Sequence, residues 1–261
     1  MNKYHTYPKP RVLIAEDHAV NQEVIKAILS HDGYEFMVVD NGLEAIELLE
    51  QEIFDVILMD MQMPVMDGCQ AAMEIRKREE VSGGRVRIIA ITANATKGDR
   101  EICMSAGMDD YITKPIDAQI LIAKLSSNSQ HDETEIIHKE TPKLSVTNAS
   151  IFNAESLKGR VLGQSVPSMK MVPMFLKELP NSLADLDLAL KANNIDEIAK
   201  LAHRMGGVAA MLGAEQMALV AEELEADARV GATKTLPDLI AKMHLASIPL
   251  KEKLLQFVRQ N

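Results

Sequence analysis

Residues 56–68 read VILMDMQMPVMDG and contain the first indication of the fold class. It opens with a short apolar run that is typical of a buried strand, and Asp60 follows directly at the end of that run. Similar runs rich in β-branched residues occupy 11–15, 36–39 and 88–92. Because amphipathic stretches separate these runs, the pattern predicts βαβ units and a parallel sheet covered by helices on both faces.

The rest of the first half completes this pattern. A fifth short strand is expected near 110–113, and a last helix is expected from about Asp117, after which the alternation stops. The other helices are predicted at 21–30, 42–51, 68–79 and 97–106. We therefore expect an α/β domain with five parallel strands at 1–125.

The second half of the chain has a different pattern. Residues 126–150 (SSNSQHDETEIIHKETPKLSVTNAS) are polar and lack periodic apolar positions, which indicates a flexible linker. Four long helical patterns follow, and Pro173 and Pro180 are expected to bend or split the first of them. The four patterns occupy 168–192, 196–212, 214–228 and 236–260. Their short connections predict an all-α antiparallel four-helix bundle at 151–261.

Charge and composition exclude several classes of function. The segment 1–125 holds 13 basic and 21 acidic residues (net −8), whereas 151–261 holds 13 of each (net 0). Neither half offers a basic surface for phosphate backbones, so nucleic-acid binding is not expected. No apolar run approaches the roughly 18 residues of a membrane span. The two cysteines form no CxxC pair and are typical of cytoplasmic thiols, so we expect a cytoplasmic protein.

Acidic residues follow two of the predicted strands. Glu16 and Asp17 end the first strand, and Asp60 ends the third. In an open α/β sheet, ligands bind beyond the carboxyl ends of the strands. Three carboxylates at adjacent strand ends would repel one another unless a cation lay among them, and a hard divalent ion with oxygen ligands meets that need. The sequence therefore predicts a Mg²⁺ site.

The combination of these motifs is more specific than any one of them. The pair Glu16-Asp17 follows strand one, Asp60 is followed by xxMPxMDG, Thr92 is followed by alanine, and Lys114 is followed by proline. This pattern resembles the receiver domain of response regulators, and MQMPVMDG and IIAITANA are most similar to receivers of hybrid histidine kinases. The resemblance implies a flavodoxin-like doubly wound sheet.

The resemblance also implies roles for individual residues. Asp60 would be the phosphoacceptor, with Glu16, Asp17 and the backbone carbonyl of Gln62 as further ligands of Mg²⁺. A carboxylate that attacks an anionic phosphoryl group needs this cation to offset the repulsion. Lys114 and Thr92 would contact phosphoryl oxygens, and Tyr111 would be an aromatic switch. Gln62 and Asn94 would flank the path of the hydrolytic water.

Some features depart from related patterns. His18 stands where such receivers place Asn or Asp, and it either retunes the metal site or, more simply, is an exposed loop histidine. A phosphatase of the haloacid dehalogenase type needs a second Asp two residues after the nucleophile, where this chain has Gln62. No glycine-rich ATP lid or Walker motif is present, so the chain is not expected to be a kinase.

The helix predicted at 196–212 carries a single histidine. His203 lies roughly 150° from the middle of the apolar stripe, which predicts that it faces water. Two helical glycines, Gly206 and Gly207, suggest that a partner protein approaches this face closely. The stretch AHRMGGVAAMLGA at 202–214 resembles the signature of histidine-containing phosphotransfer (HPt) domains, which implies that His203 is a phosphoacceptor.

The HPt resemblance has one departure. Gly206 occupies the position of the family's usual lysine, three residues after the histidine. Lys200 lies three residues before His203, about 60° from it around a helix, so its long side chain can reach the same phosphoryl oxygens. We therefore hypothesise that Lys200 replaces the missing charge; the alternative is a solvated surface lysine.

Together the two resemblances predict a phosphorelay protein. Asp60 would catalyse its own phosphorylation from a sensor or hybrid histidine kinase, and His203 would pass phosphoryl to or from a receiver such as a downstream response regulator. The alternative is an interaction protein in which phosphorylation of Asp60 controls binding and sequestration of a kinase or receiver without transfer. Both an independent protein and the C-terminal part of a hybrid kinase fit the sequence.

Overall fold

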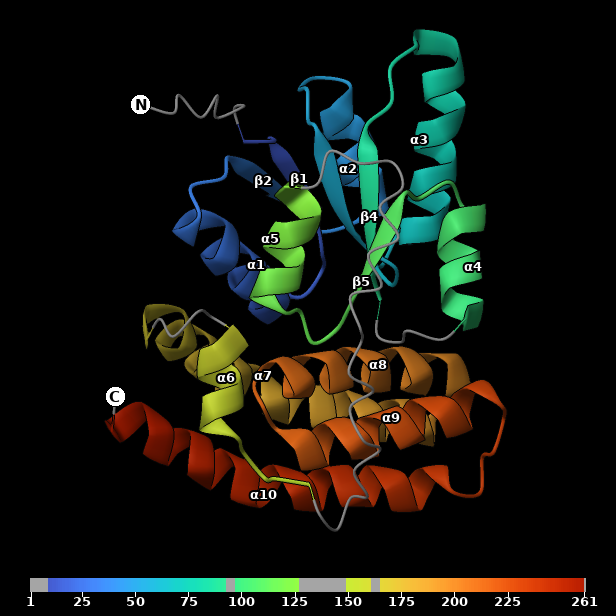
Figure 1. Cartoon of the computed structure of the whole chain (residues 1–261). Helices are drawn as coiled ribbons and strands as arrows, with labels where there is room; N and C mark the ends of the chain where they lie inside the picture. Colours follow the sequence, from blue (N-terminus) through green and yellow to red (C-terminus); the bar gives the residue numbers. More distant parts are fainter. Residues whose placement is uncertain (1–8, 93–96, 127–148, 161–164, 261) are drawn as a thin grey trace. The chain divides into compact units, whose positions relative to one another are not determined.

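The computed structural model describes residues 9–92, 97–126, 149–160 and 165–260. The chain divides into two compact units, Met1–His131 and Asp132–Asn261, which are described separately (Figure 1). No helix in the described ranges combines the length and the apolar character needed to cross a membrane.

The first unit is built on a five-stranded parallel sheet. Its strands have the order β2-β1-β3-β4-β5, so the chain order reverses beside β1. The strands are β1 (Val12–Ala15), β2 (Phe36–Val39), β3 (Val56–Asp60), β4 (Arg87–Thr92) and β5 (Asp110–Thr113). Ala15 pairs with Met59 in the ladder, so the carboxyl ends of β1 and β3 lie level with each other. This is the point where ligands bind in doubly wound sheets, and the predicted α/β class is confirmed.

Helices cover both faces of this sheet. They are α1 (Ala19–His31), α2 (Gly42–Leu49), α3 (Gly68–Ser82), α4 (Lys97–Ser105) and α5 (Ala118–Ser126). Helices α1 and α5 lie on one face, and α2, α3 and α4 lie on the other (Figure 1). Every residue of β3 is buried, as expected of a central strand covered on both sides.

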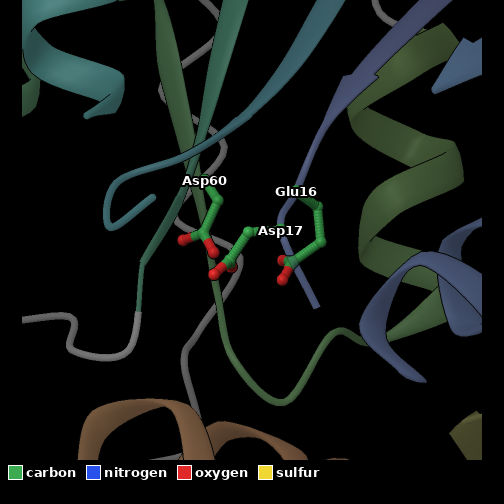
Figure 2. A group of neighbouring side chains, drawn as sticks. All are labelled: Glu16, Asp17 and Asp60. Atoms are coloured by element: carbon green, nitrogen blue, oxygen red, sulfur yellow. The ribbon is translucent and has the colours of Figure 1, made fainter. Parts of the chain in front are cut away.

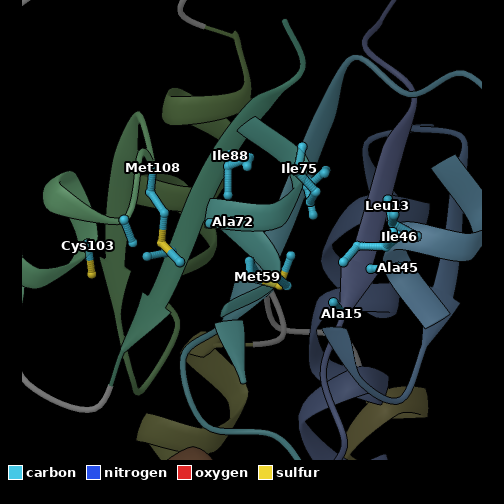
Figure 3. Packing of buried hydrophobic residues seen from close by; sticks show 14 of the residues in the cluster. Leu13, Ala15, Ala45, Ile46, Met59, Ala72, Ile75, Ile88, Cys103 and Met108 are labelled. Atoms are coloured by element: carbon cyan, nitrogen blue, oxygen red, sulfur yellow. The ribbon is translucent and has the colours of Figure 1, made fainter. Parts of the chain in front are cut away.

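The core beneath α2, α3 and α4 is aliphatic and rich in sulfur (Figure 3). Leu13 and Ala15 of β1 and Met59 of β3 belong to one cluster with Ile46 and Ile75 from the helices. These strand residues are spaced two apart, so the intervening side chains point to the opposite face, toward α1 and α5. The tightly packed sheet fixes the positions of the residues that follow each strand.

The second unit is all-helical. Its helices are α6 (Ala154–Arg160), α7 (Ser165–Lys191), α8 (Ile195–Met211), α9 (Glu215–Arg229) and α10 (Leu236–Gln260). The four long ones form the predicted bundle, and the short helix α6 was not predicted. Pro173 and Pro180 do not split α7, which is continuous across both. Both prolines are on the exposed face, while Val172, Phe175 and Leu179 maintain a buried apolar stripe past them.

The segment just before α6 is fixed to the bundle. The Ser150 amide donates a hydrogen bond to Glu215 Oε2 at 3.0 Å, and its carbonyl accepts one from the Gln216 amide at 3.1 Å. At the other end of the predicted linker, Ser126 is the last residue of α5. The flexible segment predicted from the sequence therefore falls mainly on 127–148, outside the described residues.

Candidate functional site

The acid cluster of Glu16, Asp17 and Asp60 lies at the carboxyl ends of β1 and β3. One carboxylate oxygen from each residue lies within 4.8 Å of the others, and Figure 2 shows the three carboxylates gathered at the end of the sheet. Glu16 is fully buried, Asp60 is 2% exposed and Asp17 is half-buried. The structure therefore brings together the acids that the strand ends predicted.

Lys114 projects into the acid cluster from the segment after β5. Its Nζ lies 2.7 Å from Asp60 Oδ2 and 3.0 Å from Glu16 Oε2, and its side chain is 5% exposed. Burial lowers the pKa of Lys114, but the charges of Asp60 and Glu16 outweigh that effect and raise it. The lysine is therefore a fixed cation beside Asp60. The Lys114–Pro115 peptide bond is cis.

Glu16 is held in place by several donors. Its Oε1 accepts hydrogen bonds from the His18 amide at 3.1 Å and from Asn21 Nδ2 at 2.9 Å, and its buried Oε2 lies 3.0 Å from Nζ of Lys114. Burial raises the pKa of the Glu16 carboxyl, and the nearby charge of Asp60 raises it further. Lys114 alone therefore does not offset the burial and repulsion that disfavour an ionised Glu16.

The donor set suits a hard divalent cation. Three acidic side chains surround one ammonium, so the acids outnumber the cations, and all the candidate ligand atoms are oxygens. Carboxylate oxygens are the ligands that Mg²⁺ uses in proteins. The amide of Gln62 lies 3.4 Å from Asp60 Oδ1, so the backbone at Gln62 borders the same site.

His18 has a structural role that the sequence did not indicate. It is 8% exposed, so the expectation of an exposed loop histidine is wrong. Its Nδ1 accepts a hydrogen bond from the Val20 amide at 3.2 Å and caps the N-terminus of α1. A side-chain acceptor at this position satisfies one of the free amides of the first helical turn. The histidine therefore takes the capping role that Asn or Asp would have.

The expected switch residues lie on β4 and β5. Thr92 is the last residue of β4 and is buried, and Tyr111 in β5 is half-buried. The Nζ of Lys124 lies 5.7 Å from the centroid of the Tyr111 ring and 2.5 Å from Asp110 Oδ1, which places a cation over that ring. Asn94 lies outside the described residues.

In the second unit, His203 projects from α8 toward α9. Its Nδ1 lies 3.0 Å from Glu225 Oε2 and 3.1 Å from Oε1, and its side chain is only 9% exposed. The prediction that His203 faces water is therefore wrong. Helix α8 packs against α9 as well as α7, so a residue off the main apolar stripe is still covered.

Glu225 and Arg229 are functional candidates that the sequence reasoning missed. They lie one turn apart on α9, where Arg229 Nε donates to Glu225 Oε1 at 2.9 Å. Burial raises the pKa of Glu225, but His203 and Arg229 together outweigh it and lower the pKa. An ionised carboxylate only accepts hydrogen bonds, so Nδ1 of His203 carries a proton and donates it. The i,i+4 spacing of Glu225 and Arg229 was visible in the sequence, but the short distance between Glu225 and His203 was not.

Gly206 allows this approach of α9. A Cβ placed on Gly206 would lie 3.2 Å from Ala221 Cβ, closer than ordinary packing allows. Ala221 and Glu225 are one turn apart on α9, so the close contact at Gly206 lies beside the contact at His203. The expectation that a partner protein occupies this space is wrong for Gly206, because α9 of the same bundle fills it. Gly207 is half-buried and Lys200 is exposed.

Both halves of the chain match known protein families. Residues 12–126 match the response regulator receiver domain family, and residues 170–257 match the Hpt domain family. The sensor histidine kinase GacS of Pseudomonas protegens is 30% identical over 220 residues, which cover 83% of this chain and 24% of that protein. The chain spans only 7% and 24% of the first two curated relatives that it matches.

Two solved structures are similar to parts of the chain. The receiver domain of the sensor histidine kinase PA1611 from Pseudomonas aeruginosa, determined with a magnesium ion in its active site cleft, is 45% identical, with a TM-score of 0.41. The similarity covers 45% of this chain and 95% of that one. The co-crystal structure of the Saccharomyces cerevisiae phosphotransfer protein Ypd1 with the receiver of Ssk1 gives 32% identity and a TM-score of 0.45, over 46% and 88% of the chains.

The chain therefore belongs to the two-component phosphorelay proteins. Within this class it carries a receiver domain followed by an Hpt domain, the combination to which the two sequence motifs pointed, and its relatives are hybrid and sensor histidine kinases.

Proposed function

We propose that this chain relays phosphoryl groups through two nucleophiles, Asp60 in the receiver and His203 in the Hpt domain. The observation that supports this most strongly is the position of Asp60, whose carboxylate lies 2.7 Å from Lys114 and beside two further acids. A buried carboxylate held between a fixed cation and a set of metal-type ligands is suited to accept an anionic phosphoryl group. Sensor or hybrid histidine kinases and downstream receivers are the proposed partners, in the cytoplasm.

Glu16, Asp17, Asp60 and the backbone carbonyl of Gln62 are the proposed ligands of Mg²⁺. When bound, the ion neutralises the charge of the phosphoryl oxygens and orients them. The chain's own contribution is Lys114, whose ammonium is already positioned to stabilise charge on the oxygens next to Asp60. Thr92, at the end of β4, is the proposed donor to another phosphoryl oxygen, and Tyr111 the proposed switch residue.

His203 is suited to exchange a phosphoryl group at Nε2. Glu225 holds the proton on Nδ1, so the nitrogen left to carry the phosphoryl group is Nε2. In transfer to Asp60, a carboxylate oxygen supplies the electron pair of the new P–O bond. The electron pair of the broken P–N bond returns to Nε2, and Nδ1 keeps its proton throughout. Charge and protons therefore balance without a further acid or base.

Labelling with acetyl phosphate and with phosphoramidate tests both assignments. Acyl phosphate is labile in base whereas phosphohistidine is stable, so the two sites are separated by alkaline treatment of the labelled chain. Asp60→Asn should lose the base-labile label, and His203→Gln should lose the base-stable one. Retention of the base-labile label in Asp60→Asn would contradict the receiver site.

A second function is favoured by one observation. Gly206 removes the lysine usual in Hpt domains, so the bundle could bind a kinase or receiver without transferring phosphoryl. In that case His203 would remain unlabelled by any phosphorylated receiver, although binding would still respond to phosphorylation of Asp60.

A further inference from the structure

Asn21 lies beside the acid cluster but belongs to neither of the strand ends that form it. It is in the first turn of α1 and is only 3% exposed. Its Nδ2 donates a hydrogen bond to Glu16 Oε1 at 2.9 Å, so the amide side chain faces a residue of the proposed Mg²⁺ site. The roles implied by the receiver resemblance do not include this asparagine.

The carbonyl oxygen of the same amide has no partner. Among the residues that the structure describes, no group donates to the buried Oδ1 of Asn21. The orientation of the amide is fixed, because exchanging Oδ1 and Nδ2 would turn an acceptor toward Glu16 Oε1, which already accepts from the His18 amide. A buried carbonyl oxygen without a donor costs free energy, so its retention requires a physical reason.

The first turn of α1 holds this asparagine beside Glu16. The His18 amide donates to Glu16 Oε1 at 3.1 Å, and Gln22 Nε2 donates to the Glu16 carbonyl at 2.7 Å. His18 also caps the turn, because its Nδ1 accepts from the Val20 amide. These contacts fix Asn21 relative to Glu16, so its Oδ1 stays close to the carboxylates.

The chemistry of Mg²⁺ identifies a donor for this oxygen. Mg²⁺ loses its hydration waters reluctantly and keeps several of them when carboxylates bind it in proteins. A retained water donates through its O–H groups, and a buried acceptor beside the ligands can receive such a bond. We propose that Asn21 is a positioning residue of the Mg²⁺ site, in which Nδ2 orients Glu16 and Oδ1 accepts a hydrogen bond from a water bound to the ion. This inference rests on the Mg²⁺ site proposed at Asp60.

This role predicts a preference between cations. Ca²⁺ takes about six to eight oxygen ligands in flexible geometry, whereas Mg²⁺ needs a near-ideal octahedron that includes ordered waters. Loss of an acceptor for those waters should therefore weaken the binding of Mg²⁺ more than that of Ca²⁺. In Asn21→Ala we expect the dissociation constant for Mg²⁺ to rise about 10- to 100-fold and that for Ca²⁺ to rise only a few-fold.

Calorimetric titration of the full chain with MgCl₂ and with CaCl₂ tests this role without any phosphodonor. Asn21→Leu has a similar volume and removes both polar atoms without leaving a cavity, so it should reproduce the effect of Asn21→Ala. Asn41→Ala is the matched control, because Asn41 is another buried asparagine of the receiver whose side chain caps α2 and contacts Glu44. It should lower the melting temperature in EDTA but leave both dissociation constants unchanged.

The outcomes distinguish this inference from the proposed function. Unchanged Mg²⁺ affinity in both Asn21 variants would show that the side chain takes no part in the site. Equal weakening of Mg²⁺ and Ca²⁺ would assign Asn21 to the placement of Glu16 alone and overturn the role of Oδ1. Absence of Mg²⁺ binding to wild type would instead contradict the metal site proposed at Asp60, and with it this inference.

Discussion

Glu225 controls the protonation of His203 through a hydrogen bond of 3.0 Å to Nδ1. In wild type we expect ¹⁵N NMR to show a proton on Nδ1 of His203, in the hydrogen bond to Glu225. In Glu225→Gln the glutamine amide can both donate and accept a hydrogen bond. It should therefore allow the opposite tautomer of His203 and slow phosphorylation of His203. Glu223→Gln, an exposed acid on the same helix, is the control and should leave the tautomer unchanged.

The same carboxylate gives the Hpt domain a pH-dependent contribution to stability. The folded-state pKa of Glu225 lies below its ordinary value of 4.5, so folding stabilises the ionised form. The free energy of unfolding should therefore exceed that of Glu225→Gln by about 1 to 2 kcal/mol at neutral pH. This difference should disappear as the pH falls below 4.5 through the folded-state pKa. A difference that grows on acidification, measured by denaturant unfolding, would be inconsistent with an ionised Glu225.

The charge that replaces the missing lysine can be assigned by comparing two cations. Lys200 is exposed on the turn before His203, whereas Arg229 is ion-paired to the carboxylate that contacts His203. We expect Lys200→Ala to slow transfer to His203 several-fold without abolishing it, because an exposed charge is screened. Arg229→Ala should also alter the His203 tautomer, because it removes a partner of Glu225. Transfer to Lys200→Ala at the wild-type rate would show that Lys200 does not replace the missing lysine.

At the level of elements, α8 and α9 approach closely at Gly206. In Gly206→Ala the new Cβ would lie 3.2 Å from Ala221, so α9 must shift to accept it. Alanine also favours the helix by up to about 1 kcal/mol, which offsets the packing cost. We therefore expect a small change in the free energy of unfolding but a weaker His203–Glu225 hydrogen bond, seen as a mixed tautomer by NMR. An unchanged tautomer would show that the packing of α9 at Gly206 does not affect the His203–Glu225 hydrogen bond.

The strand and helix pattern was sufficient to predict the acid cluster. Parallel strands end at one edge of a sheet, so residues at the carboxyl ends of β1 and β3 must meet there, as Glu16 and Asp60 do. The environment of His203 could not be predicted in this way. Its partner Glu225 is 22 residues away, and a single apolar stripe does not reveal which flank of α8 a second helix covers. Continuity of α7 across its prolines was also missed, because it depends on the buried stripe beside them.

At the level of the whole molecule, the proposed Mg²⁺ site places three acidic side chains close together despite their mutual repulsion. Asp17→Asn removes one of the negative charges, so it should raise the melting temperature in EDTA and abolish the increase that Mg²⁺ produces in wild type. Ligand at one hundred times its dissociation constant stabilises by about 2.7 kcal/mol, which a thermal scan detects. Glu47→Gln, an exposed acid on α2, should keep the full response to Mg²⁺. An undiminished Mg²⁺ response in Asp17→Asn would exclude Asp17 as a ligand.

We propose that this chain carries two phosphoacceptors, Asp60 and His203, that exchange phosphoryl with Hpt domains and receivers. Transfer from an Asp60→Asn chain phosphorylated on His203 to a His203→Gln acceptor, followed by base-lability of the product, measures it most directly. We expect loss of base-stable phosphate from the donor and an equal gain of base-labile phosphate on the acceptor, with no gain when the acceptor also carries Asp60→Asn. Persistent base-stable phosphate on the donor, with the acceptor still labelled by acetyl phosphate, would contradict a relay and favour binding without transfer.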